Sequence, residues 1–396
     1  MKKFTALILA ILVLSVTSCA YTADSETVPA GTIVDSDTTR ADNAAEEAND
    51  TLLNAANPSP SDNTETTTLK PPSNLTEYYS DGDTIYSLSP SGGMYSSYKE
   101  YLANYYTSPD IPDYVEYEKE YLDDYLYKDP VNTGTYGDFE YGIQSDGTCV
   151  IERYNGLSSK VTVPSEINGH TVRGIGSSAF ANKFLLKSVT IPDTVEVLGD
   201  GVFSNCILLT DVVLPDSIMV TEGWIFSGCR SLKSVRLPKH LKVLMGATFY
   251  KCTSLESVEG DLDEVYMIDT FVFYQCISLK EFKIPQNVIK ICDDAFAQCV
   301  SLKKVVFNDK LSIIEESAFD GCISLEITEL PDSIKGIYRY AFGNCYGTKN
   351  IDCPDNILFL DEAVFYEIED QINLVVSEGS ETEAYAKKYG ISYTLK

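Results

Sequence analysis

The stretch Ala295-Phe296-Ala297-Gln298-Cys299-Val300-Ser301-Leu302 returns in altered form along about two thirds of the chain. Its phenylalanine belongs to a column whose members lie 23 residues apart, with a single gap of 24. The column consists of Phe180, Phe203, Phe226, Phe249, Phe273, Phe296, Phe319, Phe342 and Phe365. Such a period is typical of repeat proteins, in which one unit is too small to fold alone and buries its apolar face against its neighbours.

Apolar residues keep the same phase around this column, five and eight residues before each phenylalanine and six and nine residues after it. In Leu279-Lys280-Glu281-Phe282-Lys283-Ile284-Pro285, Phe282 and Ile284 alternate with polar residues, which is the periodicity of a strand. Proline then ends the strand because it cannot donate to a ladder. We therefore expect a solenoid of 23-residue coils, with short parallel strands joined by tight turns or 3₁₀ pieces.

One coil is longer than the others. Its extra residue precedes Phe273 and falls between Gly260 and Val265, where the proline that ends the strand is also missing. We expect a bulge or an enlarged loop at this edge of the solenoid.

Residues 141–396 resemble the BspA-like leucine-rich-repeat family. The units that carry the resemblance are the 295–302 stretch and Gly201-Val202-Phe203-Ser204-Asn205-Cys206. Residues 154–156 and 161–169 resemble the usual first repeat, and residues 383–391 resemble the terminal helix and last strand. The resemblance implies a leucine-rich-repeat solenoid, a right-handed superhelix with a terminal cap at about residues 370–396. It also implies surface display, adhesion and protein binding, with no shared ligand.

Seven of the 11 cysteines stand three residues after a phenylalanine of the column. They are Cys206, Cys229, Cys252, Cys276, Cys299, Cys322 and Cys345. Side chains stacked in parallel about 4.8 Å apart lie beyond the roughly 3.5–4.5 Å between Cβ atoms that a disulfide needs. We expect a column of buried free thiols, with disulfides as the alternative, and no metal site because a ladder of ligands does not converge.

The first residues are typical of an exported protein. Residues 1–18 are predicted to be a lipoprotein signal peptide, since two lysines precede an uncharged run that is too short to span a bilayer. The run ends at Val16-Thr17-Ser18-Cys19, which resembles a bacterial lipobox and predicts lipidation of Cys19. An ordinary cleaved signal is the alternative.

Two segments separate this start from the repeat domain of residues 141–396. Residues 19–75 are rich in serine, threonine and aspartate and are expected to form a flexible tether. Residues 76–140 are acidic and tyrosine-rich. They are expected to be an N-terminal cap or a partly disordered stretch, or else a recognition segment for protein or glycan.

The candidate binding residues lie on the predicted strand face and at one turn. The strand face is formed by two columns, Ser188, Asp211, Ser234, Ser257, Glu281, Lys304, Ile327 and Asn350, and Thr190, Val213, Arg236, Glu259, Lys283, Val306, Glu329 and Asp352. From these we select Ser234, Arg236, Glu259, Glu281, Lys283 and Lys304 as a candidate site, and a merely solvated face is the alternative. Trp224, the single tryptophan, is added as a hot-spot candidate if its ring is exposed.

These features favour binding over catalysis. His170 and His240 lie in different repeats, and the chain holds no nucleophile elbow, phosphate loop or zinc spacing, so no enzyme, cofactor or metal is expected. A net charge of −29 makes nucleic acid an improbable partner. We expect an extracytoplasmic, adhesin-like lipoprotein that binds a protein or glycan, with host and extracellular-matrix components among the candidates, and touches the bacterial membrane through its lipid only. A passive envelope scaffold is the alternative.

Overall fold

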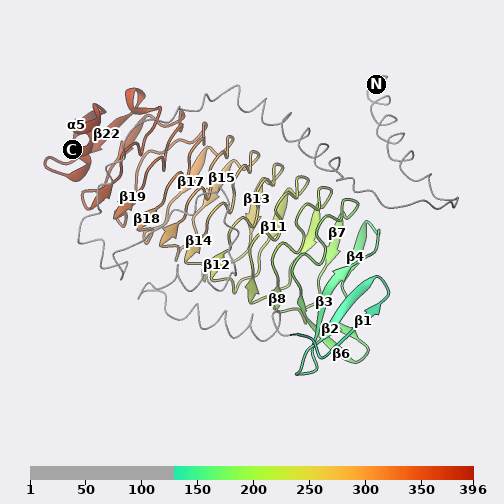
Figure 1. Cartoon of the computed structure of the whole chain (residues 1–396). Helices are drawn as coiled ribbons and strands as arrows, with labels where there is room; N and C mark the ends of the chain where they lie inside the picture. The colour runs from blue at the N-terminus through green and yellow to red at the C-terminus, as the bar shows by residue number, and fades with distance from the viewer. Residues whose placement is uncertain (1–128) are drawn as a thin grey trace, which may run out of the picture. The chain divides into compact units, whose positions relative to one another are not determined.

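The structure, a computed structural model, describes residues 129–396 (Figure 1). The predicted signal peptide, Cys19, the tether and most of the tyrosine-rich segment lie outside these residues. Within them, short parallel strands pair with partners one coil away, as in Ser188 with Asp211, at the 23-residue offset of the repeat. The predicted solenoid is confirmed.

One side of each coil carries the strand that follows the phenylalanine turn, called here a front strand. The front strands are β4 (Lys160–Thr162), β7 (Ser188–Thr190), β9 (Asp211–Val213), β11 (Ser234–Arg236), β13 (Ser257–Glu259), β15 (Glu281–Lys283), β17 (Lys304–Val306) and β20 (Asn350–Asp352). The middle residue of each points inward, and Val189, Val235 and Phe282 are buried there. The flanking residues of β11 and β15 are exposed, as period-two alternation requires.

The opposite side of the coil carries the back strands, which precede the phenylalanine. They are β6 (His170–Ile175), β8 (Val197–Leu198), β10 (Val220–Thr221), β12 (Val243–Leu244), β14 (Met267–Ile268), β16 (Lys290–Ile291), β18 (Ile313–Ile314), β19 (Gly336–Ile337) and β21 (Phe359–Leu360). Front and back strands lie along different edges of the stack in Figure 1. Both sets bury apolar side chains in one continuous core.

An antiparallel hairpin and its neighbours begin the stack. Strands β1 (Asn132–Tyr136), β2 (Phe139–Ile143) and β3 (Cys149–Tyr154) pair in antiparallel order, β3 then pairs in parallel with β6, and β5 (Glu166–Ile167) runs antiparallel to β6. The hairpin thus starts ahead of residue 141, the expected start of the repeat domain. Its Tyr154 ring stacks on Phe180, with centroids 5.2 Å apart, and so covers the first ring of the column.

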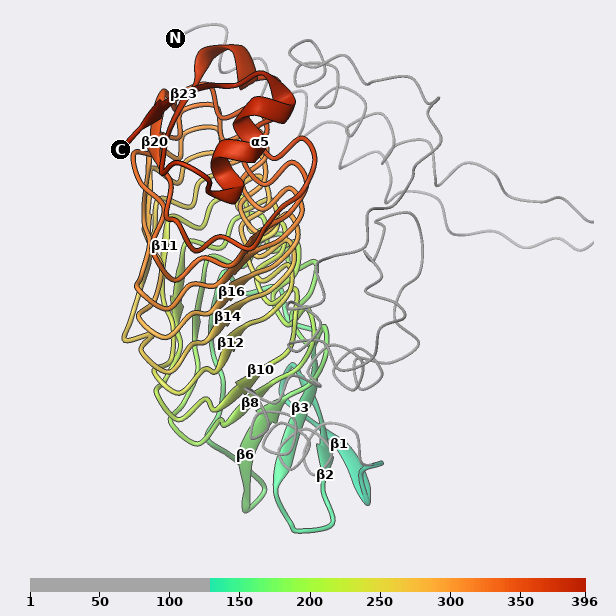
Figure 2. The same cartoon turned by 90° about the vertical axis from the view of Figure 1, so that its left-hand side faces the viewer.

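A helix covers the other end (Figure 2). After the 3₁₀ helix η2 (Glu369–Gln371) and strand β22 (Asn373–Val376), helix α5 (Glu381–Tyr389) leads to strand β23 (Ser392–Leu395). Ser380 accepts from the Glu383 backbone N–H and Glu383 accepts from the Gly379 N–H, so polar side chains cap the first turn. Left-handed Gly390, with φ of 72°, ends the helix. The helix overlaps residues 383–391, where the resemblance places the terminal helix and last strand, and β23 begins directly after that range.

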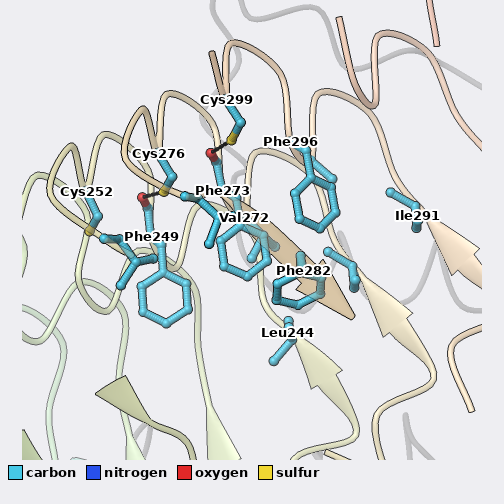
Figure 3. Packing of buried hydrophobic residues seen from close by; sticks show 14 of the residues in the cluster. Leu244, Phe249, Cys252, Val272, Phe273, Cys276, Phe282, Ile291, Phe296 and Cys299 are labelled. Atoms are coloured by element: carbon cyan, nitrogen blue, oxygen red, sulfur yellow. Dashed lines mark hydrogen bonds between the residues drawn. The ribbon is translucent and has the colours of Figure 1, made fainter. Parts of the chain in front are cut away.

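The phenylalanine column forms a stack of rings through the core (Figure 3). Phe296 is fully buried, and its centroid lies 4.9 Å from that of Phe273 and 5.1 Å from that of Phe319. Its neighbours in the column repeat this arrangement, with the last pair, Phe342 and Phe365, 6.0 Å apart. Each ring therefore contributes apolar contact to two coils at once, which one coil could not provide for itself.

The cysteine column binds the coils to one another. Each thiol donates to the carbonyl oxygen of the phenylalanine one coil earlier, as Cys276 does to Phe249 at 3.2 Å and Cys299 does to Phe273 at 3.0 Å (Figure 3). All ten cysteines of residues 129–396 are free and buried, so the expected column of buried thiols is confirmed. Burial raises the pKa of the Cys206 thiol to about 11 and that of Cys299 to about 12.

The longer coil interrupts the front sheet. Front strands β4, β7, β9, β11 and β13 form one sheet, whereas β15 pairs only with β17. Gly260 directly follows β13 with φ of 128°, and a Cβ there would lie 2.6 Å from the Leu237 carbonyl oxygen, so only glycine fits. The enlarged loop expected between Gly260 and Val265 therefore separates β13 from β15.

Thiol reactivity tests this packing directly. Because the column thiols are buried and their pKa values are raised, the chain from residue 20 onward should show almost no reaction with a thiol reagent at pH 8 in its native state. The same chain in denaturant should release ten thiols. Rapid native reaction, or fewer thiols after unfolding without reductant, would contradict the buried column or reveal disulfides.

Candidate functional site

The structure places the candidate binding residues on two separate surfaces. Ser234, Arg236, Glu259, Glu281, Lys283 and Lys304 all lie exposed on front strands β11, β13, β15 and β17. Trp224 lies on the turn before Phe226, 44% exposed, and belongs to none of these strands. Among the front-strand residues, the break after β13 divides those of β11 and β13 from those of β15 and β17. Arg236 is held in a two-point ion pair with Asp216, at 3.0 and 3.1 Å.

One residue of the predicted strand face is turned inward. Ile327 occupies the column of Ser234 and Lys304, but it is only 4% exposed, so its placement on the exposed face is wrong. Thr328 and Glu329, the next two residues, are exposed instead. The alternation of this coil is shifted at one point, where residues 327 and 328 exchange the buried and solvent-facing positions, whereas Glu329 stays exposed and Leu330 stays buried. Residues 326–330 consequently form no regular strand.

Thr348 compensates for this shift. It stands in the next coil, six residues after Phe342, where seven of the other repeats have leucine. Its buried hydroxyl accepts from the Ile327 backbone N–H at 3.2 Å and donates to the Leu325 carbonyl oxygen at 2.8 Å. A leucine could do neither, so the two departures from the repeat depend on each other.

Restoring the repeat leucine should therefore destabilise the protein. In Thr348→Leu the Ile327 N–H loses its acceptor and the Leu325 carbonyl oxygen loses one donor, which should lower the free energy of unfolding by about 1–3 kcal/mol. Denaturant unfolding of the two proteins would measure this loss. An equal or higher unfolding free energy would mean that the hydroxyl is dispensable.

The shifted coil leaves one edge of β17 open. Lys304 N–H and Val306 C=O point toward the preceding coil, where they bond to Lys280 and Ile284. The backbone N–H and C=O of Val305 point away from the preceding coil, and neither has a backbone partner among the described residues. On that side, within the described part of the chain, the nearest backbone bond runs from the Glu326 N–H to the carbonyl oxygen of Lys303, just before β17, at 2.9 Å. Residues 326–330 pair instead with β20, through Leu330 N–H to Asp352 C=O at 3.0 Å.

A groove of about 940 Å³ runs along this open edge. Its walls include Val305, Val306 and Phe307 on one side and Thr328 and Leu330 on the other. Its charged residues are Lys280, Glu281, Lys303, Lys304, Glu326, Glu329, Asp332, Asp352 and Lys396. Of the residues predicted as a site, only Glu281 and Lys304 line it.

The two ends of the groove differ in charge. Three lysines gather over β15 and β17, and of these Lys303 pairs with Glu326 at 3.3 Å. At the other end, Lys396 Nζ lies 2.8 Å from the Asp352 carboxylate, which raises the pKa of the lysine. Backbone donors and acceptors of β17 lie between these ends. The groove can therefore offer main-chain hydrogen bonds and charges of both signs to one ligand.

Buried carboxylates form a second charged feature, on the turns before the phenylalanines. Lys290 and Glu315 form a nearly buried ion pair at 2.7 Å. Close by, burial and the charge of Glu315 raise the pKa of Asp293 to about 8. Burial and the charge of Asp320 raise the pKa of Asp294 to about 7. These carboxyl groups are therefore partly protonated near neutral pH.

The stability of the solenoid should consequently fall as pH rises from about 4 to about 8. An aspartate with a raised pKa binds its proton more tightly in the folded chain, so its stabilisation is complete below the unfolded pKa near 4 and is lost as pH passes the folded value. The melting temperature should be higher at pH 6.0 than at pH 8.5. Asp293→Asn keeps the oxygen that accepts from Glu316 N–H and should reduce this difference. A difference unchanged in the variant would show that Asp293 is not responsible.

No metal-binding cluster of histidine, cysteine, aspartate or glutamate occurs among residues 129–396. The two histidines lie apart, His170 Nδ1 2.8 Å from the Gly147 carbonyl oxygen and His240 Nδ1 3.1 Å from Glu264. Within the same residues, no helix has the length and apolar character needed to cross a bilayer.

Comparison with known proteins agrees with this architecture. The family described as BspA type leucine rich repeat region matches residues 173–296 and 266–387, in six copies. A leucine-rich repeat protein from Bacteroides ovatus is 21% identical, with a TM-score of 0.50 over 69% of this chain and 76% of that chain. The T. pallidum leucine-rich repeat protein is 26% identical, with a TM-score of 0.39 over 55% of this chain and 91% of that one. The pneumococcal vaccine antigen PcpA is 12% identical, with a TM-score of 0.34 over 68% of this chain and 100% of that one. No curated protein sequence matches the chain.

Proposed function

We propose that this chain, which belongs to the BspA type leucine-rich-repeat family, is a bacterial surface lipoprotein that binds an extended segment of a partner protein. Members of this family are typically surface proteins, and a leucine-rich-repeat solenoid is a typical scaffold for binding rather than catalysis. The lipobox-like Val16-Thr17-Ser18-Cys19 supports anchoring through lipid on Cys19. Growth with a radioactive fatty acid should then label the protein but not its Cys19→Ala variant, and an unlabelled wild-type protein would contradict the anchor.

The open edge of β17 is the observation that carries the binding proposal. An exposed strand edge with unpaired N–H and C=O groups is a template onto which an extended peptide can add as a further strand. Here the edge lies between β17 and β20, beside a coil that forms no strand against it, and within residues 129–396 the Val305 N–H and C=O have no backbone partner. Lys280, Lys303 and Lys304 would select carboxylate-bearing side chains of the added segment.

Binding to an array of matrix and host surface proteins tests this proposal. The chain 20–396 is compared with Lys304→Glu, which reverses a groove charge, and with Lys233→Glu, an exposed lysine outside the groove. We expect Lys304→Glu to weaken binding about tenfold and Lys233→Glu to change it less than twofold. Val305→Pro removes the edge donor and should weaken binding further, in a protein whose melting temperature is checked in parallel.

Equal effects of the two lysine variants would place the binding surface elsewhere. Absence of binding to any arrayed protein would favour the alternative function, a passive envelope scaffold whose repeats hold no dedicated ligand.

A further inference from the structure

Four aromatic side chains form an exposed cluster on the turns around the phenylalanine column. Trp224, Tyr250, Phe271 and Tyr274 make up this aromatic ridge. The ring centroids of Trp224 and Tyr250 lie 5.5 Å apart, and Tyr250 and Tyr274 stack at 5.2 Å within 9° of parallel. Phe271 meets Tyr274 edge-on at 5.5 Å. Trp224 is 44% exposed and the other three rings are half-buried.

The solenoid does not need these rings to close its turns. Trp224 and Phe271 stand two residues before a phenylalanine of the column, and Tyr250 and Tyr274 stand one residue after one. Small or polar residues fill the same positions in most other coils, namely Ser178, Gly201, Ala247, Asp294 and Ser317 before it, and Ala181, Ser204, Ser227, Ala297 and Gly343 after it. Tyr340 and Tyr366 occupy these positions in later coils and form a separate pair, with centroids 5.3 Å apart, so aromatic residues are added to the repeat at two places in the stack.

Two of the rings occupy a backbone conformation that disfavours them. Trp224 has φ of 60° and Phe271 has φ of 59°, in the left-handed region where glycine and asparagine are the usual residues. The same position has a left-handed φ in every coil, from Ser178 to Ala363, so the conformation belongs to the turn, and the bulky residues in it distinguish the ridge from most other coils. The ridge therefore lowers the stability of its turns, which points to a role outside folding.

The indole of Trp224 is open to a ligand. Its two neighbours along the same column are Gly201 and Ala247, which carry no side chain long enough to cover the ring. A Cβ added to Gly201 would approach the Cβ of Trp224 only to 4.0 Å. The Trp224 ring therefore meets aromatic neighbours on the Tyr250 side and small residues within its own column.

The surroundings of the ridge restrict the chemistry of that ligand. Asp200 lies beside its first coil, with Oδ1 3.5 Å from the Cβ position of Gly223, and Lys251 Nζ lies over the Tyr250 ring, 5.2 Å from its centroid. A carboxylate accepts hydrogen bonds from hydroxyl groups and an ammonium group donates to them, whereas the net charge of −29 on the chain repels anions overall. Four partly exposed rings offer less than half of the roughly 800 Å² that each partner buries in a standard protein interface. A small, neutral ligand with many hydroxyl groups fits these limits.

We propose that the aromatic ridge is a binding site for neutral oligosaccharides. The C–H faces of a pyranose ring pack on the electron-rich faces of Trp224 and its neighbours, and the sugar hydroxyl groups donate to the exposed Asp200 carboxylate. The ridge shares no residue with the groove beside β17, so it would give the protein a second ligand class that is independent of the partner protein proposed above.

The fluorescence of Trp224 provides the test, because it is the only tryptophan of the chain. The chain 20–396 is titrated with hexasaccharides of glucose, xylose, mannose and N-acetylglucosamine, and with a heparin fragment as the anionic control. We expect a saturable change in emission with at least one neutral hexasaccharide and none with heparin. Tyr250→Ala should weaken that binding about tenfold, while Tyr366→Ala, which removes a tyrosine from the equivalent position of a distant coil, should leave it unchanged.

A second variant separates binding from folding. Trp224→Gly should abolish binding measured by calorimetry while leaving the melting temperature equal or higher, because glycine suits a φ of 60°. No response to any neutral hexasaccharide, a response to heparin alone, or equal losses in Tyr250→Ala and Tyr366→Ala would overturn the proposal. So would a lower melting temperature of Trp224→Gly, which would make the ring structural. An emission change on adding a partner protein alone would assign the ridge to protein binding.

Discussion

Contact between phenylalanine rings of successive coils is the interaction on which the rest of this structure depends. A single coil of 23 residues has too little apolar surface to offset the entropy of ordering it. Each buried ring, such as Phe226 between Phe203 and Phe249, closes that deficit by serving two coils. The ring stack also sets the distance between coils, and the strand ladders and the thiol hydrogen bonds of the cysteine column form at that distance.

Regularity of the stack makes its departures informative. Ile327 and Thr348 depart from their columns together, keep the core filled and leave an open strand edge at β17. Trp224 and Phe271 depart from the repeat in another way. They add apolar rings outside the core, at turn positions whose left-handed φ disfavours bulky side chains. At β17 and at the aromatic ridge, residues that depart from the repeat pattern coincide with a surface that can bind a ligand. Such conflicts between local preference and fold are expected at functional sites.

The fold follows from the sequence because its signal is repeated. The phenylalanine, leucine and cysteine columns predict the coil length, the strand positions and the free buried thiols, and each repeat confirms the others. The first strands, ahead of residue 141, lie outside the repeat and carry no such signal.

The candidate sites follow only in part. A column position predicts exposure as long as the alternation holds, which is the case for Lys304 and fails at Ile327. The sequence does contain the signal of that failure, an apolar residue in a polar column followed by threonine in the apolar one, with Thr348 replacing leucine in the next coil. The grouping of Trp224 with Tyr250 and Tyr274 was not visible from one column, because these residues belong to two columns that the turns bring together.

Residue-resolved alkylation of Phe296→Ala tests the central claim, that the ring stack holds neighbouring coils together. Removing this ring should cost about 3–5 kcal/mol. Because seven successive coils, from that of Cys206 to that of Cys345, each carry a buried thiol, mass spectrometry after brief native labelling would report where the stack opens. The account predicts that Cys276, Cys299 and Cys322 become labelled while Cys206 stays protected. Equal labelling of all the column thiols, or an unchanged unfolding free energy with no labelling of Cys276, Cys299 and Cys322, would contradict the account.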